Sequence, residues 1–310
     1  MQDIARTVAV LATGGTIAGT AARATDNIGY SAAQLGVRAL VDAVPALAEV
    51  PLVTEQVAQL DSKDMDFAVW EALAARVAHH LAKPDVAGVV ITHGTDTLEE
   101  TAYLLQRLLA PTKPVVMCAA MRPATALLRD GPQNLLDAVT LARQPGARGV
   151  MAALSGTVHS AFDVRKVHSY RVDAFGSGDA GVLARIEEGE VRRLREWPAG
   201  EPLGLELAGR TDWPWVEIVT SHAGARPDGV RALAAAGVRG LVVAGTGNGS
   251  LHHALEDALV EAQKAGVTVW RSTRCLDGPV QMKPGDRLPS AGTLTPVQAR
   301  IELMLQLMRA

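Results

Sequence analysis

Short apolar runs alternate along the chain with longer stretches in which apolar side chains recur every three or four positions. In the first half, the apolar runs predict strands at 7–11, 50–60, 86–92, 114–120 and 149–154. The periodic stretches predict helices at 31–44, 67–81, 98–109 and 130–141. This alternation is typical of a parallel sheet that helices cover on both faces.

The second half repeats this pattern on a smaller scale. It predicts strands at 215–220, 240–244 and 267–270, and helices at 229–236, 251–265 and 295–308. A hairpin is predicted at 182–196, and the stretch 198–214, rich in Gly and Pro, is the candidate linker. We therefore predict an α/β protein: a larger N-terminal domain (1–197) with a mainly parallel sheet flanked by helices, and a smaller C-terminal α/β domain (215–310).

Composition narrows the choice of partner. The chain has 310 residues, 48% of them hydrophobic, which is enough apolar material for two cores. A formal net charge of −3 indicates neither a basic surface for nucleic acid nor a polybasic stretch for a membrane. No apolar run is long enough to span a bilayer. We expect a small-molecule partner, with no nucleic acid and no membrane.

The two cysteines, Cys118 and Cys275, are far apart in the sequence and form no C-x-x-C pair, which argues against a disulfide framework. Cys118 falls within a predicted strand and is expected in the core. The N-terminus lacks the features of a signal peptide, because its first apolar run is already a strand. If Met1 is the natural start, we expect a cytoplasmic protein.

The first predicted strand stops at Gly14 and Gly15, directly before Thr16. Open α/β sheets bind ligands at the carboxyl ends of their strands. The glycines can adopt positive φ, so this loop can lift the Thr16 hydroxyl out of the sheet as a nucleophile. A phosphate-binding turn is the alternative, but the spacing is neither G-x-G-x-x-G nor that of a P-loop.

The strand predicted at 50–60 leads to Asp61, Ser62 and Lys63 at a strand-to-helix junction. These polar residues are candidates for ligand binding, since they would lie at the same edge of the sheet as the glycine loop. The alternative is that Asp61 or Ser62 only caps the helix that follows.

The strand predicted at 86–92 leads to a further polar turn. Thr97 and Glu100 have the spacing of a capping box, which gives both a structural role. Thr95 and Asp96 have no such explanation, and we expect them to project into the same crevice as the glycine loop.

The segment 20–30 and the residues Tyr30, Lys166 and Asn248 have no clear function when each is considered alone. The small and polar segment 20–30 has the composition of a mobile lid, or of an ordinary surface loop. Tyr30, at its end, could reach Thr16 or simply anchor this loop. Lys166 lies in a polar stretch and, taken alone, is a surface charge. Asn248 belongs to a second glycine-rich loop after a predicted strand.

Two motifs together carry a resemblance to a known family. Ala12–Gly19 (ATGGTIAG) and Ile91–Tyr103 (ITHGTDTLEETAY) resemble the two signatures of the bacterial L-asparaginases that use a threonine nucleophile without autoproteolysis. Shorter motifs extend the likeness over nearly the whole chain: Ala120–Pro123, Asp130–Pro132, Asp163–Lys166, Gly247–Gly249 and Ser290–Leu294.

The resemblance implies a hydrolase that converts asparagine to aspartate and ammonia. The residue that matches Thr16 attacks the side-chain amide, and the residue that matches Tyr30 assists it. Thr95, Asp96 and Lys166 match a second threonine, an aspartate and a lysine of the family's catalytic site.

The resemblance also implies a set of substrate-binding residues. Ser62 and Asp96 match the groups that hold the α-carboxylate and the α-ammonium of the substrate, and we include the neighbours Asp61 and Lys63 in this set together with Thr95. Asn248 matches a residue that the family brings into the site from a neighbouring subunit. We therefore expect a homotetramer assembled as a dimer of dimers.

The chemistry fits these roles without a metal or another cofactor. A threonine hydroxyl needs a neighbour to accept its proton, and an amide needs donors for its developing oxyanion. No H-E-x-x-H motif occurs, and His79 and His80 are adjacent, so they cannot share one helix face. A nearby Asp96 would favour protonated Lys166, which suits an electrostatic role or a relay through Thr95.

Some positions depart from the family pattern and bear on specificity. Lys63 stands where many members have glutamine, Ala254 where some have serine, and the segment after Arg274 lacks the usual acidic pattern. We expect asparagine to be favoured over glutamine by at least about tenfold in kcat/KM, with Lys63→Gln narrowing the gap.

Other functions stay open at this point. A glutaminase-asparaginase or a broader amidase would keep the chemistry and change the substrate. A non-catalytic two-domain amino-acid-binding protein would use the same glycine loops, but it would not need two threonines and a lysine at matching positions. A dinucleotide oxidoreductase lacks its fingerprint.

Overall fold

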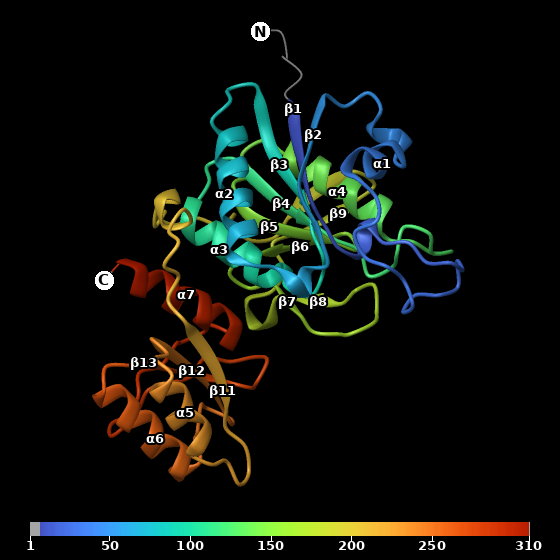
Figure 1. Cartoon of the computed structure of the whole chain (residues 1–310). Coiled ribbons are helices and arrows are strands. Elements are labelled where there is room, and N and C mark those ends of the chain that lie inside the picture. Colours follow the sequence, from blue (N-terminus) through green and yellow to red (C-terminus); the bar gives the residue numbers. More distant parts are fainter. Residues whose placement is uncertain (1–6, 310) are drawn as a thin grey trace. The chain divides into compact units, whose positions relative to one another are not determined.

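The computed structural model describes residues 7–309 and divides into two compact units, with the boundary between Gly209 and Arg210 (Figure 1). In the first unit the strands are β1 (Thr7–Gly14), β2 (Leu52–Leu60), β3 (Val86–Thr92), β4 (Pro114–Cys118), β5 (Gly149–Leu154), β6 (Thr157–Ser160), β7 (Arg165–Lys166), β8 (Phe175–Gly176), β9 (Ala184–Glu187) and β10 (Glu190–Arg193). Its α-helices are α1 (Val37–Asp42), α2 (Phe67–Leu81), α3 (Leu98–Leu109) and α4 (Gly131–Ala142). Its short 3₁₀ helices are Thr16–Ala18, Pro45–Leu47, Ser62–Asp64, Gly178–Ala180 and Leu205–Leu207.

The main sheet has eight strands in the order β10-β9-β6-β5-β4-β3-β1-β2. The strands from β1 to β5 pair in parallel, and β6, β9 and β10 extend the sheet in antiparallel pairing. All the parallel strands therefore end at one edge of the sheet, and the polar loops that follow β1 and β3 are neighbours there. The prediction of a mainly parallel sheet is confirmed.

Both faces of this sheet are covered by helices. Val8 and Val10 of β1 pack in one apolar cluster with residues of α1 and α4, whereas α2 and α3 lie on the opposite side of the sheet (Figure 1). Ala9 and Leu11 alternate with Val8 and Val10 and are also fully buried. Burial on both faces explains why β1 is apolar at consecutive positions instead of alternating with polar residues.

The second unit is a smaller α/β domain, as predicted. Its strands β11 (Val216–Thr220), β12 (Gly240–Gly245) and β13 (Thr268–Thr273) pair in parallel, and its helices are α5 (Asp228–Ala235), α6 (His253–Lys264) and α7 (Pro296–Arg309). Residues of α5 and α6 form an apolar core with β12 and β13, and α7 packs against β11 and β12.

The helix predicted at 31–44 is wrong for its first half, because the α-helix covers only Val37–Asp42. Ala33 has a φ of 55°, and its N–H donates to the carbonyl of Gly15 at 3.1 Å. The next two N–H groups donate to the carbonyl of Ala18 at 2.7 and 2.9 Å. This segment therefore bonds to the loop that carries Thr16 instead of forming its own helical turn.

Two glycines let the loops after β1 and β3 approach each other. Gly15 has a φ of +80°, and a Cβ at this position would overlap the backbone of Gly94. A Cβ on Gly94 would in turn overlap the side chain of Ser62. Three loops thus meet at the carboxyl edge of the sheet, with no room for a side chain at Gly15 or at Gly94.

We predict that Gly15→Ala lowers the free energy of unfolding by at least about 2 kcal/mol, because it adds overpacking to an unfavourable φ. The matched control is Gly146→Ala. Gly146 has a similar φ of +75°, but a Cβ added at this position would have no described atom within 4 Å. This control should lose only about 1 kcal/mol, the cost of the backbone conformation. Urea denaturation of both variants measures the difference, and equal losses would contradict the close-approach argument.

Candidate active site

A cavity of about 250 Å³ lies at this edge of the first unit. Ten residues line it: Thr16, Asn27, Ile28, Tyr30, Thr95, Asp96, Met121, Lys166, Ser169 and Tyr170. They come from the loops after β1, β3 and β4, from the segment 20–30, and from the end of β7 and the loop that follows it. All five residues predicted to be catalytic from the sequence border this one space.

Thr16 begins the 3₁₀ helix that follows β1, and it is 8% exposed. Its hydroxyl lies 2.7 Å from the hydroxyl of Tyr30, and either oxygen can be the donor. The positive φ values of Gly14 and Gly15 turn the chain sharply out of the strand and place Thr16 at the cavity. Tyr30 therefore reaches back to Thr16 rather than only anchoring its own loop.

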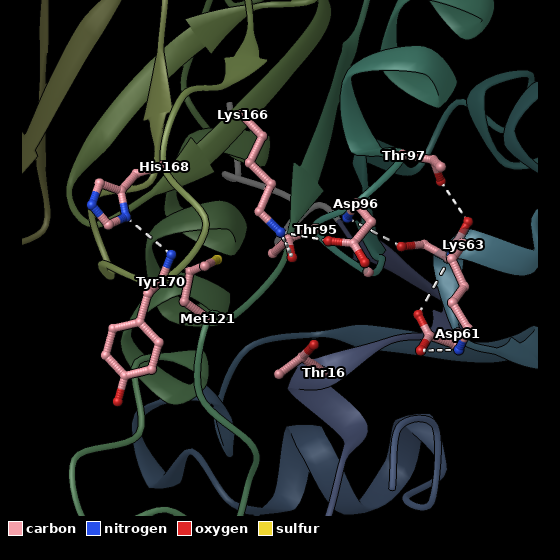
Figure 2. Close-up of polar contacts among 12 residues, drawn as sticks. Thr16, Asp61, Lys63, Thr95, Asp96, Thr97, Met121, Lys166, His168 and Tyr170 are labelled. Carbon is pink, nitrogen blue, oxygen red and sulfur yellow. Dashed lines mark hydrogen bonds and ion pairs between the residues drawn. The ribbon is translucent and has the colours of Figure 1, made fainter. Parts of the chain in front are cut away.

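Lys166 contacts the other two residues of the predicted set, Thr95 and Asp96 (Figure 2). Its Nζ donates to Thr95 Oγ1 at 2.9 Å and to Asp96 Oδ1 at 2.5 Å. Thr95 is 5% exposed, whereas the Asp96 side chain is 54% exposed. A lysine that donates to a carboxylate at this distance is an ammonium ion, because the charged pair is the form that this contact stabilises.

The Thr95 hydroxyl accepts a hydrogen bond from Lys166 and borders the cavity. Since its oxygen accepts a hydrogen bond from Lys166, its own hydrogen is available to a group in the cavity. Figure 2 shows Thr16 on one side of the space and the group of Thr95, Asp96 and Lys166 on the other. A molecule between them would meet the Thr16 hydroxyl on one side and, on the other, a hydroxyl that accepts a hydrogen bond from Lys166.

Ser62 lies behind Asp96 rather than beside it. Its side chain is 2% exposed, its Oγ accepts the N–H of Asp96 at 3.2 Å, and it is not among the described residues that line the cavity. Its carbonyl accepts the hydroxyl hydrogen of Thr97 at 2.8 Å. The predicted capping box is therefore wrong at Thr97, whose side chain makes no capping hydrogen bond and ties two loops together.

Asp61 and Lys63 pair with each other on the surface next to Ser62. Asp61 caps the 3₁₀ helix by accepting the N–H of Lys63, and its carboxylate also accepts from Lys63 Nζ at 2.8 Å (Figure 2). The hydrogen bond with Asp61 raises the pKa of Lys63 above its ordinary value, and Asp64 lies 3.7 Å away. The cation is thus directed at two carboxylates of its own turn, and neither Asp61 nor Lys63 is among the described lining residues.

Five lining residues had no specific role in the sequence reasoning: Asn27, Ile28, Met121, Ser169 and Tyr170. Tyr170 contacts both Asn27 and Arg122. Its hydroxyl lies 3.5 Å from Asn27 Nδ2, its carbonyl accepts from Arg122 at 2.7 Å, and the Arg122 guanidinium lies 4.2 Å from its ring centroid. The composition of segment 20–30 is compatible with a lid or with an ordinary surface loop, and nothing local to Tyr170 indicates its place at the cavity.

A buried hydrogen-bond chain supports the turn that carries Thr95. His93 Nδ1 lies 2.7 Å from the carbonyl of Gly94, and His93 Nε2 lies 3.0 Å from Thr101 Oγ1, which also accepts from Trp70 at 2.9 Å. Burial lowers the pKa of His93 to about 4, so the ring is neutral near pH 7. Nδ1–H then donates to Gly94, and Nε2 accepts from Thr101.

Asn248 belongs to the second unit. Its Oδ1 accepts the N–H of Gln281 at 2.8 Å, and its Nδ2 donates to the carbonyl of the same residue at 2.9 Å. Asn248 is not among the described residues that line the cavity of the first unit. Its side chain therefore orders a loop of its own unit.

Metal-binding clusters and membrane-spanning helices are both absent from residues 7–309. No group of three or more His, Cys, Asp or Glu side chains in this range is placed to hold a metal ion. No helix in the same range is both long and apolar enough to cross a membrane.

Comparison with known proteins identifies the family of the chain. The family model described as "Asparaginase, N-terminal" matches residues 7–199, and the model described as "Glutaminase/Asparaginase C-terminal domain" matches residues 215–310. The chain is 39% identical to L-asparaginase 2 of Escherichia coli, covering 97% of this chain and 88% of that protein. It is 37% identical to the glutaminase-asparaginase of Pseudomonas fluorescens, covering 97% and 86%.

A solved structure gives the same result for the fold. The structure described as a probable cytoplasmic L-asparaginase from Campylobacter jejuni matches with a TM-score of 0.93 and 38% identity, covering 98% of this chain and 96% of that one. The two family models thus match the two domains in chain order, and the relatives match over nearly the whole chain. The chain belongs to the asparaginase family, with an asparaginase N-terminal domain and a glutaminase/asparaginase C-terminal domain.

Proposed function

We propose that this chain is an amidohydrolase that converts L-asparagine to L-aspartate and ammonia. The observation that carries the proposal is the meeting of Thr16 with Tyr30, and of Thr95 with Lys166 and Asp96, around one cavity. Family membership supports the same reaction, since relatives over nearly the full chain bear asparaginase names. Incubation with asparagine, followed by measurement of ammonia, tests the proposal directly.

In the proposed mechanism, Thr16 Oγ1 attacks the carbon of the side-chain amide. Tyr30, at 2.7 Å, assists by exchanging a hydrogen bond as the Thr16 proton leaves. The attack releases one proton, and the amide nitrogen needs one proton to depart as ammonia. Thr95 gives its hydroxyl hydrogen to the amide nitrogen as the C–N bond breaks and ammonia leaves, the Lys166 ammonium returns a proton to Thr95, and the proton released by Thr16 restores Lys166. Water then attacks the ester formed on Thr16, its oxygen enters the new carboxylate, the bond to Thr16 Oγ1 breaks, and a proton from the water restores the Thr16 hydroxyl.

Asp96 and Ser62 form the proposed clamp for the amino-acid end of the substrate. The half-exposed Asp96 carboxylate is placed to bind the α-ammonium. Ser62 Oγ accepts the Asp96 N–H and keeps its hydroxyl hydrogen for the α-carboxylate. The hydrogen bond between the Asp96 N–H and Ser62 Oγ holds the two residues of the clamp together.

We further propose a homotetramer built as a dimer of dimers, in which Asn248 of a neighbouring subunit completes the site. The resemblance of the Gly247–Gly249 motif to the family supports this assembly. We propose a cytoplasmic location on the likeness to the Campylobacter jejuni protein, which is described as cytoplasmic.

A glutaminase-asparaginase is the second candidate, because the Pseudomonas fluorescens relative carries that name. Glutamine is one methylene longer than asparagine, so the same clamp would hold its amide at a different distance from Thr16. A methylene mismatch typically changes discrimination by about 1–3 kcal/mol. The two functions therefore differ in substrate and share the chemistry.

We predict that Thr16→Val and Thr95→Val each lower kcat for asparagine by at least about 10³-fold, because each removes a hydroxyl that acts on the reacting amide. Valine keeps the β-branched shape, so circular dichroism and the thermal midpoint should change little. Thr54→Val, on β2 and away from the cavity, is the matched control and should keep full turnover. Near-normal turnover in either active-site variant would remove that threonine from the mechanism.

We predict that Lys166→Met is as damaging as Thr95→Val, because Lys166 acts through the Thr95 hydroxyl. The double variant should then be no slower than either single variant, since the two residues form one unit. Steady-state kinetics of the three variants form the double-mutant cycle. Additive losses in the double variant would show that the two residues act independently.

We predict that asparagine is favoured over glutamine by at least about tenfold in kcat/KM. Lys63→Gln was expected from the sequence to narrow this ratio. Because Lys63 is held by Asp61 and Asp64, we now expect the ratio to stay unchanged in that variant. Equal efficiencies for the two substrates in the parent protein would favour the glutaminase-asparaginase candidate.

A further inference from the structure

The backbone of Lys166 is held by a side chain outside the predicted site. Glu99, the second residue of α3, accepts the N–H of Lys166 through Oε2 at 2.8 Å. Strand β7 has two residues and pairs only with the two-residue β8, so little sheet fixes this segment. The Glu99 contact links the main chain of Lys166 to the helix that follows Thr95 and Asp96, the two partners of its Nζ.

The surroundings of Glu99 make its charge unusual. Glu100 lies next to it on the same helix, Arg165 and Lys166 face it from β7, and Asp96 pairs with Lys166 in the preceding turn. Burial raises the pKa of Glu99 to about 7, and the negative charge of Glu100 acts in the same direction. Glu99 therefore changes its charge in the pH range in which the enzyme would work.

We propose that Glu99 is a positioning residue for the reaction, which keeps Lys166 Nζ on the Thr95 hydroxyl only when its carboxylate is ionised. This inference rests on the proposed roles of Thr95 and Lys166. A hydrogen bond to a charged acceptor is roughly twice as strong as a neutral one, so protonation of Glu99 weakens its hold on the Lys166 backbone. The ionised carboxylate also attracts the positive charge of Lys166 electrostatically.

Ionisation of Glu99, which should raise kcat, should lower the free energy of unfolding. Its pKa in the folded protein lies above the ordinary value of 4.5, so its favourable contribution to folding is complete below about pH 4.5. That contribution is lost as the pH rises through about 7. An ionised Glu99 therefore lowers the free energy of unfolding at high pH. A residue retained only for the stability of the fold would not have this effect, whereas a residue retained for function can have it.

The test is the pH dependence of kcat and KM for asparagine in the parent protein and in Glu99→Gln. Glutamine keeps the length and an acceptor oxygen but cannot ionise. We expect kcat of the parent to rise at least tenfold from pH 5.5 to 8 with an apparent pKa near 7. In Glu99→Gln we expect no such rise, a kcat close to the low-pH value of the parent, and a KM within about threefold of the parent value.

Thermal unfolding gives the second readout. Glu99→Gln should raise the thermal midpoint at pH 8 and leave it nearly unchanged at pH 4.5. The matched control is Glu100→Gln, which removes the neighbouring negative charge and should move the kcat transition to lower pH without lowering its plateau. A transition near pH 7 that survives in Glu99→Gln would overturn the inference. A loss of thermal stability at both pH values would overturn it too, because it would assign Glu99 a purely structural role.

Lys166→Met separates this inference from the proposed function. If Lys166→Met keeps normal turnover, the proposed relay fails and Glu99 has nothing to position. If Lys166→Met is inactive while Glu99→Gln retains the parent's kcat and pH profile, the relay stands and the role of Glu99 alone is rejected.

Discussion

The close approach of three backbone loops at one edge of the sheet is the constraint on which the site depends. The loop after β1 touches the loop after β3 at Gly15 and Gly94, and Gly94 lies against Ser62 in the loop after β2. Any side chain at either glycine would push these loops apart. The parallel arrangement brings the strand ends together, and the glycines let Thr16 and Thr95 border one cavity.

Around this contact, hydrogen bonds over long sequence separations fix the loops that have no regular structure. Residues 33–35 donate to the carbonyls of Gly15 and Ala18, and Thr97 bonds to Ser62. His93 holds the carbonyl of Gly94 from within the core. Preorganised groups of this kind need no rearrangement when charge develops in a reaction, which is how electrostatic stabilisation becomes effective.

The charges of the site are balanced locally and at some cost to stability. The Lys166 ammonium contacts the carboxylate of Asp96, while the carboxylate of Glu99 lies under its backbone N–H. Burial raises the pKa of Glu99, whereas the exposed pair of Asp61 and Lys63 is placed at the surface, where such pairs contribute little. A buried carboxylate whose ionisation is disfavoured therefore contacts the main chain of Lys166, a residue that lines the cavity.

The sequence alone determined most strands and helices of both domains and the two loops that carry Thr16 and Thr95, because these depend on local periodicity and on glycine at strand ends. The short strands β6, β7 and β8 were not predicted, because they lie in segments without a clear apolar pattern. It also indicated, through the family motifs, that Tyr30, Asp96 and Lys166 belong together. Only the tertiary structure decided that residues 31–36 leave the helical pattern, that Thr97 bonds to Ser62, and that Lys63 is held by Asp61. The same holds for the place of Tyr170 at the cavity and for the contact of Glu99 with Lys166. Each of these depends on which distant backbone group or charge lies within reach of a side chain, and local periodicity carries no information about such neighbours.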